Sequence, residues 1–135
     1  MSRPAVPLTR HLLRVRDLMD RAYAEPLDIS TLARRACLSR AHFIRTFKDT
    51  FGESPHRYLM TRRLERAKAL LRAGELSVTE VCLAVGFTSL GSFSTQFRRF
   101  VGDSPNGYAK RHAHSPAELD RIPSCYVRMR TRPTL

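Results

Sequence analysis

The chain has 135 residues, with 24 Lys and Arg against 12 Asp and Glu, a formal net charge of +12 and a sequence pI of about 11.0. This length allows one compact domain or two small subdomains with a modest core, and leaves no room for a large ligand-binding domain. So basic a balance in an ordinary globular composition points first to a polyanionic partner. An anionic membrane surface is the weaker candidate, because no segment combines a clean apolar face with aromatic anchors and Trp is absent. We expect no membrane-spanning segment, since no apolar run is long enough.

Hydrophobic periodicity and cap residues predict about seven helices, and the fold class is therefore all-α. Residues 1–7 form a proline-bearing tail, and Glu25-Pro26 ends the first helix. The predicted helices cover about residues 8–24, 29–36, 40–51, 55–73, 78–84, 89–101 and 105–111. Beyond them, prolines and arginines break the pattern, and the only elements suggested are a short helix at 116–119 and an extended segment at 125–129.

The fourth helix is the longest, and both of its ends are marked. Ser54 can accept from the first free amides, Pro55 suits the first helical position because it lacks an amide, and Gly74 permits a left-handed exit. One apolar stripe along this helix consists of Met60, Leu64, Ala67 and Leu71. At about 1.5 Å per residue the helix is about 27 Å long, near the spacing of about 34 Å between successive major-groove faces.

The segments before and after this helix are two copies of one motif. Upstream of Phe43 the copies match at an offset of forty-nine residues, so the second copy has one extra residue in its turn. From there on the offset is fifty, and it pairs Phe43 with Phe93, Phe47 with Phe97, Gly52 with Gly102, Ser54-Pro55 with Ser104-Pro105, and Tyr58 with Tyr108. This repeat predicts a pseudo-symmetric pair of subdomains, since two copies are too few for a solenoid.

Each copy parses as a helix, a tight turn and a second helix. The cap residues are Asp28 and Ser39 in the first copy, then the capping box Ser77–Glu80 and either Thr88 or Ser89 in the second. The turns at 37–39 and 85–87 need a small residue for close packing, as a helix-turn-helix requires. We predict a first helix with a helix-turn-helix (1–53), a linker helix (54–74), a second helix-turn-helix (75–111) and a basic C-terminal tail (112–135).

The outward faces of the two second helices argue against a plain helical bundle without a nucleic-acid role. In the first copy Phe43, Phe47 and Phe51 face the core, which leaves outward Arg40, Ala41, Ile44, Arg45 and Lys48. In the second copy Phe93, Phe97 and either Phe100 or Val101 face inward, which leaves Leu90, Gly91, Ser92, Thr95, Arg98 and Arg99. An isoleucine among exposed basic residues needs an apolar partner, and a thymine methyl group would serve.

The sequence offers no site for catalysis, for a cofactor or for a metal ion. His112 and His114 do not share a helix face and have no acidic or thiol ligand beside them. No paired carboxylates, Ser-His-Asp set or phosphate-binding glycine loop is present. Cys37, Cys82 and Cys125 form no Cys-x-x-Cys pair, and the first two fall at core positions of the repeat. We therefore expect reduced, buried thiols, as in a reducing cytoplasm.

The stretch from Val81 to Tyr108 carries a specific set of residues: Gly86-Phe87, Phe93, Phe97, Gly102, Pro105 and Tyr108. With this spacing it resembles the C-terminal signature of the AraC/XylS family of bacterial transcription regulators. The first copy and the linker pattern Arg63-Leu64-x-x-Ala67-x-x-Leu70-Leu71 also fit, so the resemblance covers about residues 8–111. It implies two helix-turn-helix units joined by the long helix, each with its second helix in a major groove, in a short stand-alone member of the family.

Carried over by position, the resemblance implies the following base-contact residues: Arg40, Ala41, Ile44, Arg45, Leu90, Gly91, Ser92 and Thr95. Candidates for phosphate contact are Ser39, Lys48, Ser89, Arg98, Arg99 and Lys110. The second reading helix departs from the family pattern, because its outward positions commonly include a glutamine or arginine. Whether this second unit reads bases or only holds the DNA backbone stays open.

We expect a monomer without cofactor, located in the cytoplasm at the nucleoid, that regulates transcription by binding two unlike blocks of double-stranded DNA. Activators predominate in the family that the chain resembles, and RNA polymerase is a further partner to consider. Two alternatives remain, neither of them an enzyme. One is an architectural nucleoid protein that binds DNA by charge alone, and the other is an adaptor whose basic tail binds an acidic protein partner.

Overall fold

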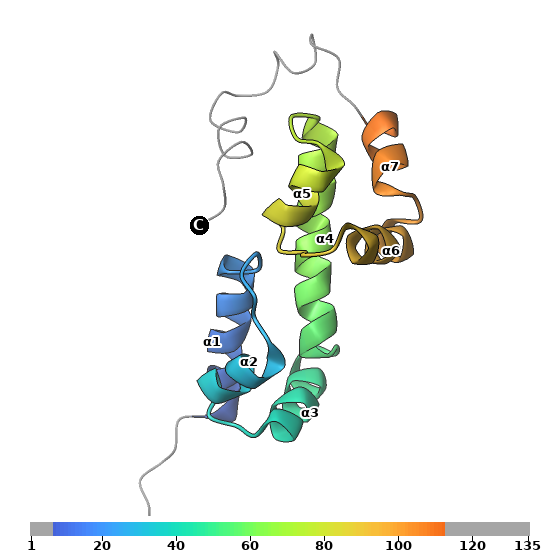
Figure 1. Cartoon of the computed structure of the whole chain (residues 1–135). Helices are drawn as coiled ribbons and strands as arrows, with labels where there is room; N and C mark the ends of the chain where they lie inside the picture. The colour runs from blue at the N-terminus through green and yellow to red at the C-terminus, as the bar shows by residue number, and fades with distance from the viewer. Residues whose placement is uncertain (1–6, 113–135) are drawn as a thin grey trace, which may run out of the picture. The chain divides into compact units, whose positions relative to one another are not determined.

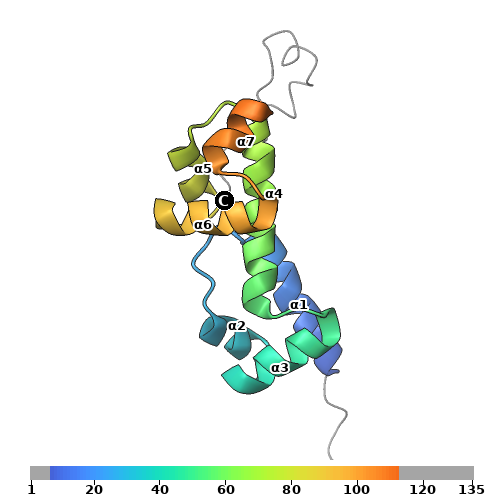
Figure 2. The ribbon, with the colours of Figure 1, turned by 90° about the vertical axis from the view of Figure 1, so that its right-hand side faces the viewer.

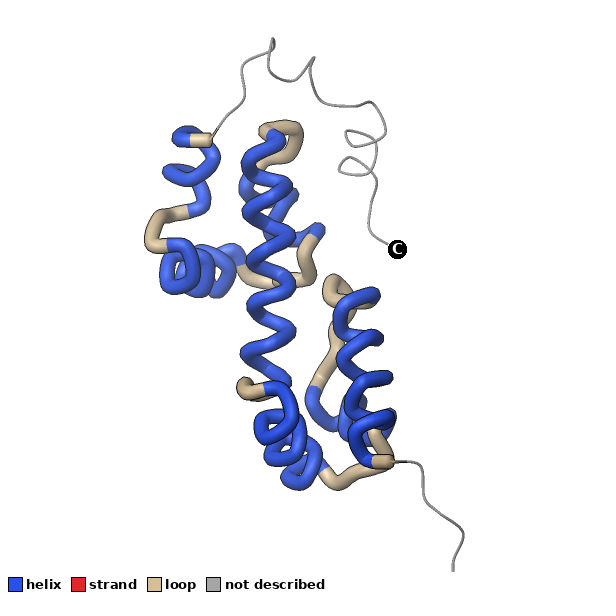
Figure 3. Tube along the Cα trace, turned by 180° about the vertical axis from the view of Figure 1, so that it is seen from behind, coloured by secondary structure: helices blue, strands red, loops and turns tan. Residues whose placement is uncertain are grey.

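The computed structural model describes residues 7–112, which form seven helices and no strand (Figures 1 and 3). The helices are α1 (Leu8–Arg21), α2 (Ile29–Arg35), α3 (Arg40–Phe51), α4 (Pro55–Ala73), α5 (Val78–Ala84), α6 (Leu90–Val101) and α7 (Pro105–Arg111). The all-α prediction is confirmed. The chain divides into two compact units, Met1–Arg62 and Arg63–Leu135, and the boundary between them falls within α4. Unit 1 thus takes the first turns of α4, and unit 2 takes the rest.

Unit 1 is built around the inward faces of α1, α2 and α3. Its core contains Leu12, Val15, Met19, Leu32, Ala33, Ala36, Phe43, Phe47 and Leu59. The rings of Phe43 and Phe47 meet edge to face at 5.7 Å between centroids, and Tyr58 of α4 adds a third ring 5.8 Å from Phe47. The Tyr58 hydroxyl donates to Oδ1 of Asp20 at 2.7 Å, which ties the start of α4 to α1. These aromatic contacts fix which side of α3 faces inward.

Unit 2 repeats this arrangement with α5, α6 and α7. Its buried side chains include Ala67, Leu70, Leu71, Val81, Cys82, Val85, Phe87, Phe93, Phe97 and Tyr108. The Phe93 and Phe97 rings lie 5.7 Å apart, and Tyr108 meets Phe97 at 5.5 Å. The Tyr108 hydroxyl accepts from Nη1 of Arg72 at 2.7 Å. Helix α6 runs across the direction of α4, so it is seen end-on in Figure 1 and from the side in Figure 2.

The cap residues act as the sequence predicts. The hydroxyls of Ser39 and Ser89 accept from the amides of the third helical residues, both at 3.2 Å, and Asp28 caps α2 in the same way. Ser89 rather than Thr88 is thus the cap of α6. Ser77 and Glu80 form the predicted capping box. Two glycines with left-handed backbone end α3 and α6, Gly52 at φ 83° and Gly102 at φ 90°.

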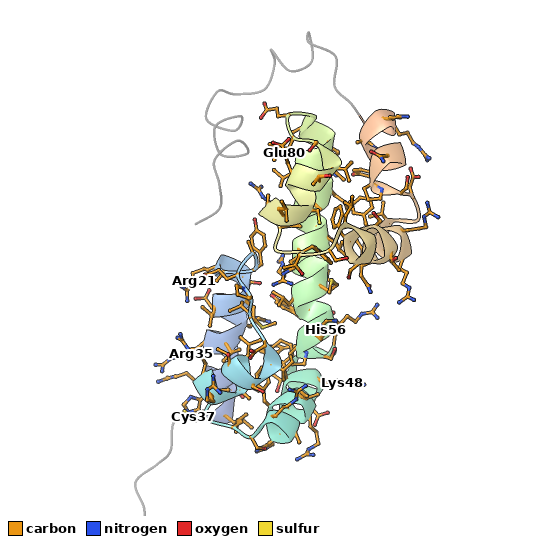
Figure 4. All side chains as sticks on the ribbon, viewed as in Figure 1. Arg21, Arg35, Cys37, Lys48, His56 and Glu80 are labelled. Carbon is orange, nitrogen blue, oxygen red and sulfur yellow. The ribbon has the colours of Figure 1, made fainter. Side chains whose placement is uncertain are left out.

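Cys37 corrects one prediction. We expected a buried thiol at a core position of the repeat, but Cys37 is exposed on the turn between α2 and α3, where Figure 4 labels it. Its φ is 61°, in the left-handed region, and the matching Gly86 has φ 100°. The turn therefore requires left-handed backbone at this position. Cys82 is buried as expected, and burial raises the pKa of its thiol.

Three smaller differences concern helix ends and faces. Helix α1 ends at Arg21 instead of near residue 24. Leu59, 6% exposed, takes the inward position in unit 1, whereas Met60 of the predicted stripe is only half-buried. Phe100 is 39% exposed beneath the ammonium of Lys68, so Val101 is the residue that turns inward. The predictions for residues 1–6 and 113–135, Cys125 and His114 included, lie outside the described residues.

The strained turn predicts a stabilising substitution. Cys37→Gly should raise the free energy of unfolding by about 0.5–1 kcal/mol, because relief of the left-handed backbone outweighs the extra entropy of an unfolded glycine. Gly86→Ala, the matched change in the second copy, should lower it by about 1–2 kcal/mol. Urea unfolding of both variants measures these differences. A loss of stability in Cys37→Gly would show that the thiol itself stabilises the turn.

The capping box predicts how acid affects stability. The hydrogen bond from the Ser77 amide lowers the pKa of Glu80, whose ordinary value is 4.5. A carboxylate with a lowered pKa stabilises the fold above its unfolded pKa, and this contribution disappears as the pH falls below about 4.5. Glu80→Gln still offers an acceptor but does not titrate, so its free energy of unfolding should fall less between pH 5 and pH 3. Urea titrations of wild type and Glu80→Gln at both pH values measure the difference, and an equal fall in the two proteins would contradict a role of the Glu80 carboxylate.

Candidate nucleic-acid interface

In unit 1, helix α3 presents a polar, basic face opposite its buried phenylalanines. Phe43 and Phe47 are both 0% exposed, so residues half a turn away must face solvent. The sequence-predicted residues on this face are Ser39, Arg40, Ala41, Arg45 and Lys48, all exposed, and Ile44, which is half-buried. Nη1 of Arg40 lies 3.4 Å from the Ser30 hydroxyl of α2, and Lys48 extends away from the core (Figure 4). The face thus offers guanidinium donors with one apolar side chain between them.

In unit 2, helix α6 has the same geometry and a different chemistry. Phe93 and Phe97 are again 0% exposed. The sequence-predicted residues that face solvent are Ser89, Leu90, Gly91, Ser92, Thr95, Arg98 and Arg99, all exposed. The cations lie in the last turns of α6, whereas the first turns carry no charged side chain. Lys110, also exposed, belongs to α7 and not to α6.

An open groove of about 590 Å³ lies along α6 in unit 2. Its walls are formed by Leu90, Ser94, Thr95, Arg98 and Arg99 of α6, by Val78 of α5 and by the segment 104–106 at the start of α7. Sequence reasoning missed Val78, Ser94 and Asn106. Val78 and Asn106 could have been found from the caps Ser77 and Ser104, because each cap places the residues after it at a solvent-facing helix start. The groove shows that three helices of unit 2, rather than α6 alone, border this surface.

Positive charge is shared by both units. Residues 7–62 carry eleven Lys and Arg against six Asp and Glu, and residues 63–112 carry eight against four. Ion pairs at 2.8 to 3.8 Å use side chains outside the two outward faces: Arg21 with Asp17, Arg57 with Glu53, Arg62 with Asp20, and Arg111 with Asp103. Each unit therefore has an excess of cations with which to attract a polyanion.

Within residues 7–112, no group of three or more His, Cys, Asp or Glu side chains is placed to hold a metal ion. No helix in this part is long and apolar enough to cross a membrane. The outward faces of α3 and α6 are thus the surfaces on which the sequence-predicted contact residues gather.

Comparisons with known proteins agree with this geometry. A family model described as a helix-turn-helix domain matches residues 32–111. The transcriptional regulator ArgR of Pseudomonas aeruginosa is 34% identical over 88 residues, which are 65% of this chain and 27% of ArgR. The chain spans less than half the length of ArgR and of two other curated relatives.

Two solved structures show the same fold. A probable AraC family transcriptional regulator from Rhodopseudomonas palustris has a TM-score of 0.70 at 25% identity, over 78% of this chain and 99% of that one. The DNA-binding domain of the global transcriptional factor AdpA, solved with a target DNA, has a TM-score of 0.66 at 33% identity, over 80% and 94%. On the family model, the relatives and the fold together, the chain belongs to the AraC/XylS family of helix-turn-helix DNA-binding transcription regulators.

Proposed function

We propose that this chain is a sequence-specific regulator that reads two adjacent major-groove segments of double-stranded DNA as a monomer. The proposal rests on the outward faces of α3 and α6, which differ in chemistry. Each face lies opposite two buried phenylalanines at matching positions of its own helix. The AdpA domain, whose structure contains a target DNA, supports DNA as the partner. Because the two faces differ, the target site is asymmetric, with two unlike blocks about one helical turn apart.

In unit 1, the base contacts are made by hydrogen bonds. Arg40 and Arg45 are exposed on α3, and a guanidinium can donate two hydrogen bonds to O6 and N7 of a guanine. Ile44, half-buried between them, contacts a thymine methyl group. Ala41 leaves room for the base edges to approach. One good bidentate pair is worth about 1–3 kcal/mol of discrimination between bases, so one arginine can define one position of the block.

The remaining cations hold the DNA backbone. Lys48 on α3, Arg98 and Arg99 on α6 and Lys110 on α7 are exposed and contact phosphates. The first amides of α3 and α6, next to Ser39 and Ser89, lack acceptors within their own helix and add neutral donors. These contacts place the protein on the duplex without reading sequence. In unit 2, the positions that face the bases are those of Leu90, Gly91, Ser92 and Thr95.

Selection of binding sites tests the proposal. The full chain, incubated with a random-sequence duplex library at about 150 mM salt, should enrich two unlike blocks whose centres lie about 10 base pairs apart. Salt at this concentration weakens attraction by charge alone, so enrichment reports contacts to bases. Binding of one protein per site, measured by sedimentation of the complex, should confirm the monomer.

Other outcomes of the selection identify the alternatives. No enriched sequence would contradict the specific regulator and favour an architectural protein that binds by charge. A palindromic site occupied by two chains would contradict the monomer. Loss of a protein partner but not of DNA binding on deletion of residues 112–135 would favour the adaptor.

Substitution of two arginines distinguishes contacts to bases from contacts to phosphates. Arg45→Ala should weaken binding to the selected duplex about 10-fold and leave binding to random duplex nearly unchanged, because one base contact is lost. Arg99→Ala should weaken both alike and reduce the slope of log K against log salt by about one unit. Titrations at several salt concentrations measure both effects. An equal loss on both duplexes in Arg45→Ala would contradict its role in reading.

A further inference from the structure

The first turns of α6 lack the donors that α3 uses. Arg40 and Leu90 are the first residues of α3 and α6, and Arg45 and Thr95 are the sixth, so each guanidinium of the unit 1 face is replaced by an aliphatic or methyl-bearing side chain. Both residues are exposed, and Leu90 is 45% exposed. An aliphatic side chain cannot read a base by hydrogen bonding. In the major groove, the one apolar group that distinguishes a base pair is the 5-methyl group of thymine.

The groove along α6 brings Leu90 next to positive charge. Leu90 and Thr95 line the same open groove as Arg98 and Arg99. A duplex whose phosphates are held by these arginines would place its base edges at the first turns of the helix. Leu83 of α5 is a contrasting case, since it is even more exposed, at 61%, but does not line the groove. Leu90 is thus an exposed leucine located where bases are expected.

Gly91 provides a second, independent observation. Its backbone has ordinary helical φ, and a Cβ built on it would meet only Oγ of Ser89, at 3.8 Å. The fold therefore needs no glycine at this position, although glycine in a helix is about 1 kcal/mol less favourable than alanine. Gly107 differs, because a Cβ there would lie 2.5 Å from Oδ1 of Asp103. The missing side chain of Gly91 thus leaves space for something outside the protein, beside Leu90 and one turn before Thr95.

We propose that unit 2 reads DNA by apolar contact: Leu90, together with the methyl group of Thr95, recognises the 5-methyl groups of thymines, and Gly91 lets α6 approach closely enough to do so. This inference rests on the proposed function and specifies how its second block is read. In this proposal, unit 2 recognises particular bases and does more than contact the DNA backbone. The second block should therefore contain thymines at which hydrogen bonding contributes little.

Removal of single methyl groups from the DNA tests the proposal. In the selected duplex, the block that is unaffected by Arg45→Ala belongs to unit 2. Replacement of each thymine in this block by deoxyuracil removes only the 5-methyl group and keeps the Watson–Crick pairing. At one or two positions the affinity of the full chain should fall about 4-fold, the loss expected for one buried methyl group. Equal affinity for thymine and uracil at every position would overturn the proposal and leave the proposed function intact.

A leucine pair provides the matched variants. Leu90→Ala should bind the thymine duplex about 4-fold more weakly than wild type. At one thymine position it should no longer distinguish uracil from thymine, as a double-mutant cycle requires of two groups in contact. Leu83→Ala, the control from α5, should keep the full discrimination. A Leu90→Ala variant that distinguishes the two bases at every position where wild type does would overturn the assignment to Leu90. If the selection enriches no second block, this inference and the bipartite proposal fail together.

Gly91→Ala tests the close approach with two separate readouts. The variant should unfold at the same or a higher urea concentration than wild type, since alanine favours the helix and meets no obstacle in the fold. It should nevertheless bind the selected duplex at least 5-fold more weakly. Affinity equal to that of wild type would overturn the role of Gly91. Reduced stability would be the result of a purely structural glycine and would overturn it as well.

Discussion

Both units depend on contacts between aromatic rings, which form a ladder on the buried side of α3 in unit 1 and of α6 in unit 2. In unit 1, Phe43 and Phe47 form the buried side of α3, their rings contact each other, and the Phe47 ring contacts Tyr58 of α4. In unit 2, Phe93, Phe97 and Tyr108 repeat the contacts within 0.3 Å. Large rings with a preferred edge-to-face geometry leave a helix little freedom to rotate about its axis. The ladder therefore determines which side chains of α3 and α6 face outward, before any of them contacts DNA.

The two units share this ladder and differ in what surrounds it. The hydroxyl of Tyr58 donates to Asp20, whereas that of Tyr108 accepts from Arg72. A phenol can do either, so the ring position is kept while its polar partner changes. The turn before each reading helix behaves alike, since Cys37 and Gly86 both adopt left-handed backbone. Because the packing is duplicated and the outward residues differ, the two units present surfaces of different chemistry.

Much of the fold could be predicted from the sequence because its signals are local. Asp28, Ser39 and Ser77 cap their helices through the amide three residues on, and such hydrogen bonds depend on neighbouring residues only. Predictions failed where the outcome depends on packing or backbone angle. A cysteine in a repeat gives no sign of positive φ, and periodicity could not choose between Leu59 and Met60, or between Phe100 and Val101. Likewise, Ser94 and Asn106 border one groove only because α6 and α7 pack together.

Charge and specificity have separate origins in this protein. Both units carry about twice as many Lys and Arg as Asp and Glu, so attraction to DNA is spread over the whole described chain and cannot itself select a sequence. Selection must come from the few outward positions that the aromatic ladders leave free. There the units diverge most, with Arg40 and Arg45 in one and Leu90 and Thr95 in the other. Under the proposed function, this duplicated scaffold with unlike outward faces recognises an asymmetric site, which gives a single chain an orientation on its DNA that a symmetric dimer lacks.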